Sequence, residues 1–196
     1  MGNSVAAREL GDIYQAMVFW KYAIQMFRDS DIGQIGYEYG KVKSFDDIVI
    51  CYKKEQRFRD TYIDTDYIQV KFHVKQSDEF TMDNLLDPAF INAKTNSFLQ
   101  NVVNAYKNDK IDFSRSRFTM YSVWRIRPGD ILNKLISNTN KAFDLNELQK
   151  GKTENSEMGR LRKKLCERLS VSESELIDIL RQVRIKDGQE SMESLK

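Results

Sequence analysis

Residues 67–74 read Tyr67-Ile68-Gln69-Val70-Lys71-Phe72-His73-Val74. Side chains that alternate with a period of two are typical of a β-strand, because successive residues point to opposite faces of a sheet. One face of this predicted strand is apolar, whereas the other carries Gln69, Lys71 and His73 in succession. Such a polar row costs free energy unless its groups meet water, a metal or a substrate. We therefore expect a functional site on this face.

A second predicted strand covers residues 45–53 and carries two adjacent acids, Asp46 and Asp47. By alternation Asp47 shares a face with Phe45, and Asp46 shares the other face with Ile48. This alternation favours Asp47 as the functional carboxylate. The choice stays open, because a β-bulge would exchange the two acids. A third predicted strand covers residues 34–40 and carries Glu38 near its C-terminal end.

The residue types on these strands suit hydrolysis of a phosphodiester. Magnesium prefers carboxylate and carbonyl oxygens as ligands. We expect Asp47, Glu38 and the amide oxygen of Gln69 to hold Mg²⁺ or Mn²⁺. Lys71 would position or deprotonate the attacking water and stabilise the transition state. These four residues are the predicted catalytic set.

Three more residues are expected to lie next to the metal ligands and to contact them or the phosphate. Gln15 is a polar group on an apolar side of the predicted helix 7–28, so its amide either reaches the active site or satisfies backbone groups. His73 would contact phosphate or simply pack, and Asp46 is the alternative acid. Taken singly, an Asp pair or a Gln-x-Lys strand usually has a structural explanation. The combination in consecutive strands favours a site.

The rest of the chain predicts an α/β layer structure. Helices are expected at 92–107 and 129–136, a strand at 117–127, and a polar loop at 54–66. The polar stretch 137–156 separates a nuclease core, residues 1–140, from a helical extension, residues 141–196. Ser172 and Glu175 predict a capping box inside that extension. The polar tail from Lys186 onward is expected to fray.

Composition limits the function classes. The chain of 196 residues is 41% hydrophobic and 31% charged, which is ordinary for a globular protein, and its net charge is +2. One histidine and two cysteines exclude a Cys/His zinc site and a disulfide framework, which favours a reducing cytoplasm. The longest apolar run is too short to span a bilayer.

Duplex DNA requires cationic side chains along its phosphates. The predicted DNA contacts are Lys43, Lys75, Arg115, Arg117, Arg125 and Arg127. The competing explanation for the arginines is a strand with solvated basic ends. Because no feature predicts contacts to base edges, we expect little sequence preference.

Several segments together resemble a known family. They are Gly11-Asp12-Ile13-Tyr14-Gln15, Tyr37-Glu38, Phe45-Asp46-Asp47-Ile48-Val49 and Gln69-Val70-Lys71-Phe72-His73, with Phe80-Thr81, Asp87-Pro88, Trp124-Arg125-Ile126 and Pro128-Gly129-Asp130 as weaker matches. From about residue 11 to 183 the chain is similar to the PD-(D/E)xK double-stranded DNA endonuclease domain at the N-terminus of bacterial anti-phage effectors. Examples are the cyclic-oligonucleotide-activated nucleases of CBASS systems and the Avs-type STAND ATPases.

The resemblance implies a restriction-endonuclease-like fold, which is a central mixed β-sheet flanked by helices, here with a small C-terminal helical subdomain. It implies Mg²⁺-dependent cleavage of double-stranded DNA, activation by homo-oligomerisation, and fusion to a sensor or STAND ATPase module. The sequence has no Gly-rich Gly-Lys-Ser/Thr phosphate loop, so we expect an effector domain of a longer protein. Gln69 departs from the wider pattern, because it replaces an acid and removes a charge from the metal site.

Two other function classes compete with the nuclease. One is a non-catalytic interaction or oligomerisation module, in which the polar strand face binds a partner. The other is a different metal-using hydrolase or nucleotidyl enzyme built on the same acids. Activity tests on DNA, RNA and nucleotides, with and without Lys71, separate the three.

Overall fold

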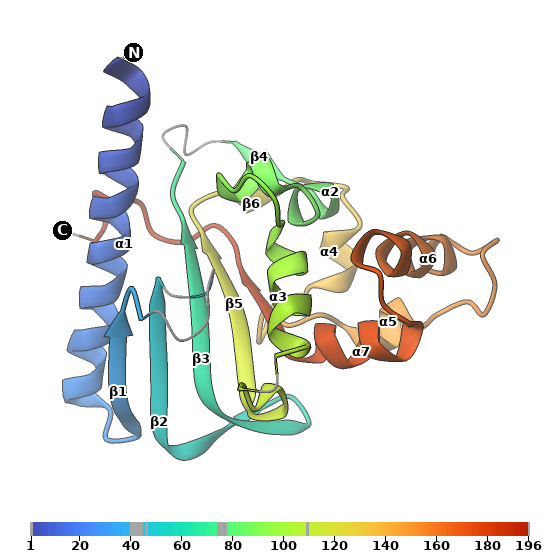
Figure 1. Ribbon diagram of the computed structural model, residues 1–196, viewed down its shortest axis with the longest axis horizontal. Helices are drawn as coiled ribbons and strands as arrows, with labels where there is room; N and C mark the ends of the chain where they lie inside the picture. Colours follow the sequence, from blue (N-terminus) through green and yellow to red (C-terminus); the bar gives the residue numbers. More distant parts are fainter. Residues whose placement is uncertain (1, 40–44, 46, 74–77, 109, 196) are drawn as a thin grey trace.

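The computed structural model describes residues 2–39, 45, 47–73, 78–108 and 110–195, with side chains from residue 6 onward. A five-stranded mixed β-sheet lies at its centre (Figure 1). In spatial order its strands are β1 (Ile32–Tyr37), β2 (Ile48–Phe58), β3 (Thr61–Lys71), β5 (Ser116–Ser122) and β7 (Val183–Lys186).

The β1-β2 and β2-β3 pairs are antiparallel, whereas the β3-β5 and β5-β7 pairs are parallel. This arrangement confirms the predicted α/β class with a mixed sheet flanked by helices, and it is consistent with a restriction-endonuclease-like fold. The parallel pairs need crossover connections, and the helices between β3, β5 and β7 supply them.

One face of the sheet is covered by the long helix α1 (Gly2–Arg28). Tyr14, Val18 and Tyr22 recur every four residues along it, so they form one buried stripe. That stripe packs against Ile48 and Ile68 of β2 and β3. The predicted helix 7–28 is confirmed, with one further turn at its beginning.

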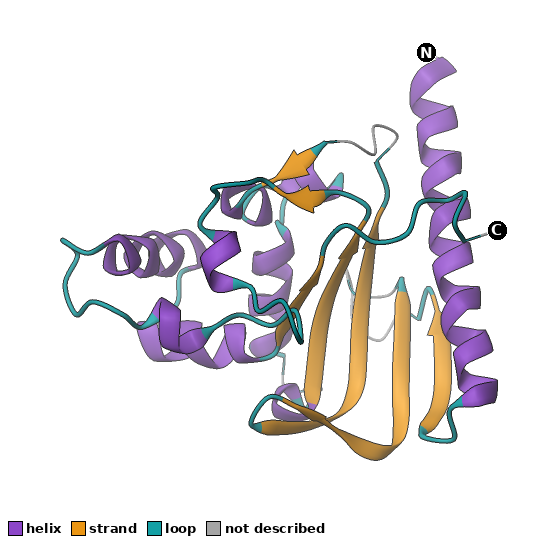
Figure 2. Cartoon of the chain, turned by 180° about the vertical axis from the view of Figure 1, so that it is seen from behind, coloured by secondary structure: helices purple, strands orange, loops and turns teal. Residues whose placement is uncertain are grey.

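The other face of the sheet carries the remaining helices (Figure 2). They are α2 (Met82–Leu85), α3 (Phe98–Tyr106), α4 (Leu132–Leu135), α5 (Leu145–Leu148), α6 (Glu157–Leu169) and α7 (Glu173–Arg181), with 3-10 turns η1 (Pro88–Ile91) and η2 (Phe113–Arg115). Their apolar sides and the sheet bury one continuous cluster, which includes Phe45, Phe98 and Phe118. The predicted capping box of Ser172 and Glu175 begins α7.

The expectation of a loop at 54–66 is wrong. β2 continues to Phe58 and β3 already begins at Thr61, so the two strands form a long hairpin. Phe58 and Ile63 are buried and anchor the hairpin, although most of the residues around them are polar. Two apolar anchors among many polar residues are too few to show a strand pattern.

The predicted strand 117–127 is divided in two. β5 ends at Ser122, and β6 (Arg125–Ile126) pairs instead with β4 (Glu79–Phe80) in a separate two-stranded sheet. Between them the Ser122 hydroxyl accepts a hydrogen bond from the backbone N–H of Trp124, which turns the chain. Local side-chain chemistry thus ends a strand whose alternation continues.

The expectation of a fraying tail is also wrong. Val183 and Ile185 are buried and place β7 beside β5, so part of the predicted helical extension belongs to the central sheet. The following residues cross to α1, and both figures show the C-terminus beside that helix. There Glu190 accepts hydrogen bonds from Tyr121 and Lys21 through its carboxylate and from Tyr14 through its carbonyl oxygen.

Over the described part of the chain, no helix combines the length and the apolar character that crossing a bilayer requires.

Candidate active site

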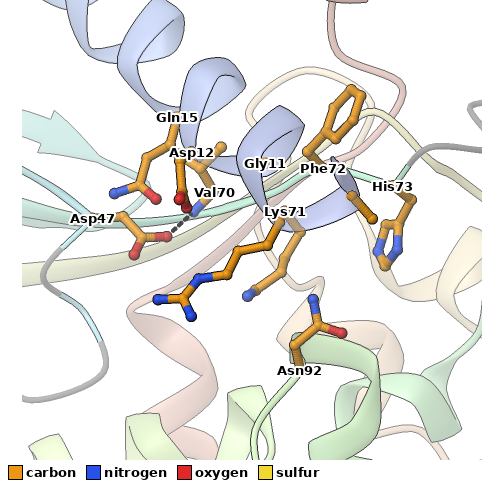
Figure 3. A pocket seen from close by; sticks show the side chains of 11 residues that line it. Gly11, Asp12, Gln15, Asp47, Val70, Lys71, Phe72, His73 and Asn92 are labelled. Carbon is orange, nitrogen blue, oxygen red and sulfur yellow. Dashed lines mark hydrogen bonds between the residues drawn. The ribbon is translucent and has the colours of Figure 1, made fainter. Parts of the chain in front are cut away.

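A pocket of about 660 Å³ opens where the C-terminal end of β3 meets the N-terminal half of α1 (Figure 3). Its lining residues are Ala7, Arg8, Gly11, Asp12, Gln15, Asp47, Val70, Lys71, Phe72, His73 and Asn92. The pocket therefore collects groups from α1, from the beginning of β2, from β3 and from the residue after η1.

Asp47 and Lys71 lie on the same side of the sheet. Ile48 pairs with Ile68 in the antiparallel ladder, so the next pair along the strands is Asp47 with Gln69. Alternation then puts Lys71 on the side of Gln69 and Asp47, as the sequence predicted. In Figure 3 Phe72, the next residue along, points away from Asp47 and Lys71. Asp46 lies outside the described residues, so the alternative ligand is not placed.

Backbone groups hold both side chains. The Asp47 carboxylate accepts a hydrogen bond of 2.7 Å at Oδ2 from the backbone N–H of Val70. The Lys71 amine donates a hydrogen bond of 2.8 Å through Nζ to the backbone carbonyl of Ile91. Both functional groups are therefore fixed by main-chain atoms of rigid elements, which is how precise catalytic geometry is maintained.

The electrostatic environment of Lys71 is unusual for a lysine. Burial lowers the pKa of its amine, and the nearby charge of Asp47 opposes that effect only in part. A lowered pKa increases the fraction of neutral amine, which can accept a proton. The amine thus donates to the Ile91 carbonyl at a position where burial favours its neutral form.

Gln69 precedes two lining residues, Val70 and Lys71, but is not itself part of the lining. Its side chain is 7% exposed, and within the described residues its Oε1 has no hydrogen-bond partner. A buried amide oxygen without a donor costs about 1–3 kcal/mol. The neighbouring Asp47 cannot supply that donor when it is ionised. A cation or its bound water is a partner that satisfies both groups at once.

Glu38 follows β1 and does not line the pocket, in contrast to its predicted place in the metal site. It is exposed and has a left-handed backbone, with φ of 47°, and its N–H donates to the carbonyl of Asp47. Burial, followed by the charges of Glu38, Asp12 and Asp47, raises the pKa of Tyr37. Glu38 is therefore near enough to Tyr37 to share its surroundings with Asp12 and Asp47, but it lies outside the pocket.

Sequence reasoning missed three polar residues of the pocket, namely Arg8, Asp12 and Asn92. Arg8, Asp12 and Gln15 are spaced by four and three residues, which places them on one side of α1. Farther along the helix the same side is buried and apolar. This change from polar to apolar residues along one side of the helix is the sequence feature that could have indicated a site. Asn92 has φ of 55° after η1, a conformation that asparagine tolerates well, but its sequence context gave no signal.

Gln15 lines the pocket beside Asp12 and Asp47 (Figure 3), so of its two predicted roles the structure places it at the site. His73 also lines the pocket, but its ring stacks on Trp124 with centroids 3.5 Å apart. Burial and the positive charge of Lys71 lower the pKa of His73 to about 4. His73 is therefore neutral at physiological pH and offers no positive charge to a phosphate.

The donor set of the pocket fits a magnesium ion only in part. Within the described residues, no three carboxylate, imidazole or thiolate side chains lie close enough together to hold a metal. Magnesium, however, is often bound through one or two carboxylates together with substrate phosphates and water. Asp47 and Asp12 provide carboxylates in the lining and Gln15 provides an amide oxygen, while the unpartnered Oε1 of Gln69 is buried outside the lining. This set matches that mode of binding.

Arg117 is wrong as a predicted DNA contact. It is buried and its guanidinium pairs with Asp66 at 2.7 Å, and Arg184 pairs with the same carboxylate. Thr119 also donates to Asp66, and Arg117 and Arg184 contribute to lowering the pKa of that acid to about 2. Alternation alone could not show that the acid on a neighbouring strand neutralises the arginine inside the fold.

The other predicted DNA contacts have different surroundings. Arg115 pairs with Glu55 and Asp64 at the beginning of β5, whereas the pocket adjoins the other end of that strand, about 20 Å away. Arg125 begins β6 and Arg127 directly follows it; both are exposed, and Arg127 pairs with Glu79 at 3.7 Å. Lys43 and Lys75 lie outside the described residues.

No protein-family model matches the chain. A curated relative, CD-NTase-associated protein 4 of Enterobacter hormaechei subsp. hoffmannii (strain UCI 50), is 32% identical to it over 200 residues. That match covers 100% of this chain and 40% of the relative, so the chain spans about two fifths of the relative's length.

Proposed function

We propose that this chain is a metal-dependent endonuclease domain that hydrolyses phosphodiester bonds of double-stranded DNA. One observation carries the proposal: Asp47 and Lys71 line one pocket, and among the described residues the buried Oε1 of Gln69, two positions before Lys71, has no hydrogen-bond partner. An acid, an amide oxygen and a desolvated amine on neighbouring strands are the groups that the PD-(D/E)xK resemblance implies, with glutamine in the second acidic position.

Asp47 and Gln69 would hold Mg²⁺ or Mn²⁺, and Asp12, which lines the pocket, would supply the second carboxylate in place of Glu38. When bound, such a cation neutralises phosphate charge and lowers the pKa of a coordinated water. Gln15, beside Asp12, would orient the water molecules around the carboxylates through its amide. Two carboxylates with amide oxygens leave coordination positions for a phosphate oxygen and water.

Lys71 would hold the attacking water and take up its proton. Burial favours the neutral amine, and the hydrogen bond to Ile91 fixes the direction of the Nζ atom. After proton uptake the ammonium group lies next to the negative charge of Asp47, which stabilises it. The same charge can stabilise the phosphorane-like transition state.

Arg8, on α1, and Asn92, directly after η1, both line the pocket together with Lys71. We assign them to the phosphate groups next to the scissile bond, because a guanidinium and an amide both donate hydrogen bonds to phosphate oxygens. Arg125 and Arg127 would extend the contact to the flanking duplex. None of these groups points to base readout, so cleavage is expected to have little sequence preference.

The biological setting is part of the proposal. The relative's name associates it with a CD-NTase, and the segments around the site resemble anti-phage effector nucleases. The chain covers two fifths of that relative, which supports an effector domain joined to further modules. We infer a cytoplasmic role in degrading DNA during defence against phage.

Digestion of supercoiled plasmid tests the function. Wild type and Lys71→Ala are compared with Mg²⁺ or with EDTA over a wide range of protein concentration, because such domains can require clustering. Lys54→Ala is the matched control, since Lys54 is an exposed lysine of β2 outside the pocket. Cleavage should require Mg²⁺ and be lost only in Lys71→Ala.

Activity that survives in folded Lys71→Ala would overturn the assignment of this pocket. Absence of cleavage by wild type at every concentration would favour the non-catalytic interaction module. Cleavage of RNA or nucleotides in preference to duplex DNA would favour a different hydrolase at the same site.

A further inference from the structure

A row of apolar side chains follows the solvent side of α1, opposite its buried side. We call this row the α1 stripe, and its members are Leu10, Ile13, Met17, Trp20, Ile24 and Phe27. They are separated alternately by three and four residues, which is the heptad spacing of helices that pair with another helix. The stripe makes no contribution to the sheet-facing core, which uses Tyr14, Val18 and Tyr22.

Four of the six side chains of the α1 stripe are exposed, and Leu10 and Met17 are half-buried. Phe27 is 84% exposed, Trp20 62% and Ile24 52%. With about 200 Å² for each such large side chain, the stripe leaves on the order of 500 Å² of apolar surface in water. This is as large as the largest apolar patch of a typical monomer, and such patches mark interaction sites.

A shallow groove widens the stripe toward the end of the chain. Its volume is about 510 Å³, and Met17, Trp20 and Ile24 form one wall while Leu195 lies on the other. The C-terminal segment is held there by the hydrogen bonds of Glu190 to Lys21 and Tyr121. The groove is therefore formed by α1 and the C-terminal segment together.

We propose that the α1 stripe pairs with the α1 stripe of a second copy of this chain, in antiparallel orientation. The spacing of the stripe is symmetric about its midpoint between Met17 and Trp20. A two-fold axis at that midpoint sets Leu10 against Phe27 of the partner copy, Ile13 against Ile24, and Met17 against Trp20. Every apolar residue then meets an apolar residue, which is the self-complementarity that a two-fold interface requires.

Charge favours the antiparallel arrangement over the parallel one. In the antiparallel register Glu9 of one helix lies level with Arg28 of the other. A parallel pair would bring Lys21 level with Lys21 and Arg28 level with Arg28, so like charges would stand side by side. Antiparallel helices also align their dipoles favourably.

The available area suits a dimer. A standard interface buries about 800 Å² on each partner. The stripe supplies about 500 Å² of that as apolar surface, and the tail beside the groove supplies polar and apolar surface at the edge. Arg8, Asp12 and Gln15 leave α1 on its other side, so the pairing keeps both candidate active sites open.

Sedimentation velocity on the full chain tests the pairing. Wild type should form a dimer as concentration rises, and Trp20→Glu should raise the dissociation constant at least tenfold. Tyr62→Glu is the matched control, because Tyr62 is an aromatic residue that is 57% exposed on β3, outside the stripe. Circular dichroism checks that each variant is folded. A wild type that stays monomeric, or a Trp20→Glu variant that dimerises equally well, overturns the proposal.

Disulfide trapping tests the orientation. In a background without Cys51 and Cys166, Ile13→Cys chains are mixed with Ile24→Cys chains and oxidised gently. Antiparallel pairing predicts the mixed disulfide, whereas pairing of Ile13→Cys chains with one another would overturn the antiparallel register. Neither result depends on nuclease activity, so failure here is distinguishable from failure of the proposed function.

Discussion

The carboxylate of Asp47 accepts a 2.7 Å hydrogen bond from the backbone N–H of Val70, the residue between Gln69 and Lys71. This bond joins the beginning of β2 to the end of β3 at the point where the ladder leads into the pocket. It orients the acid and fixes the register of the two polar residues that flank Val70. The Asp47–Val70 hydrogen bond therefore affects both the stability of the fold and the proposed metal site. Substitutions of Asp47 can separate these two effects.

Asp47→Asn should abolish activity while the fold is kept. The asparagine retains an oxygen that can accept from Val70, but it loses the charge that would hold a cation, so cleavage should fall about 100-fold or more. Asp47→Ala should lose the same activity and also about 1–3 kcal/mol of stability, because the Val70 N–H becomes unsatisfied. Plasmid digestion and urea unfolding measure the two effects. Equal stability of both variants would contradict the role of this bond.

Replacing Gln69 by an apolar residue should keep or increase stability but abolish cleavage. Gln69→Leu removes the orphan buried oxygen, so the free energy of unfolding should stay equal or increase while cleavage is lost. Gln69→Glu adds a carboxylate beside Asp47 and should tighten Mn²⁺ binding about tenfold in calorimetric titration. A Leu variant that cleaves like wild type would show that the amide oxygen has no role.

Lys186 should make stability depend on pH. Burial and the nearby charge of Arg184 lower its pKa from 10.5 to about 7, and its Nζ donates to the hydroxyl of Tyr22. Between about pH 7 and 10.5 the unfolded chain binds the proton that the folded chain has lost, so stability rises with pH across this window.

The Lys186 contribution to the slope is at most about 1.4 kcal/mol per pH unit. Lys186→Met should remove that contribution and stabilise the protein at pH 7, as measured by urea unfolding over pH 6–10. Lys53→Met, at an exposed lysine of β2, is the control and should leave the slope unchanged. A Lys186→Met variant with an unaltered slope would contradict the assignment.

DNA affinity should depend on Arg125 and Arg127 rather than on Arg115. Each phosphate contact contributes about 0.9 to the slope of log K against log salt. The double variant Arg125→Ala, Arg127→Ala should therefore flatten that slope and weaken binding to duplexes of any sequence. Arg115→Ala, whose guanidinium is paired with acids far from the pocket, is the control. Fluorescence anisotropy over a salt series measures both.

Strand alternation and helix periodicity predicted the parts of the fold that depend on local pattern. They placed α1, the core of β2 and β3, the capped helix α7, and Asp47 on the side of Lys71. They failed where contacts distant in sequence decide the structure. β7 is only four residues long and directly follows a helix, so its strand pattern was too short to detect.

Sequence patterns likewise predicted only those residues of the candidate site that lie on neighbouring strands. Residues of one strand pair could be grouped from the sequence, because alternation assigns the side chains of each strand to one of its two faces. Arg8, Asp12 and Asn92 reach the pocket from elements whose positions only the tertiary fold sets. Arg117 looked like a surface cation, because its partner Asp66 lies on another strand.

Anomalous scattering from manganese in crystals of the protein would show directly whether Asp47 and Gln69 hold a metal ion. We expect one peak, bound by an Asp47 carboxylate oxygen and by Gln69 Oε1. Lys71 Nζ should lie beside a water bound to that ion. A peak at other acids, or an empty pocket at manganese concentrations that support cleavage, would contradict this assignment.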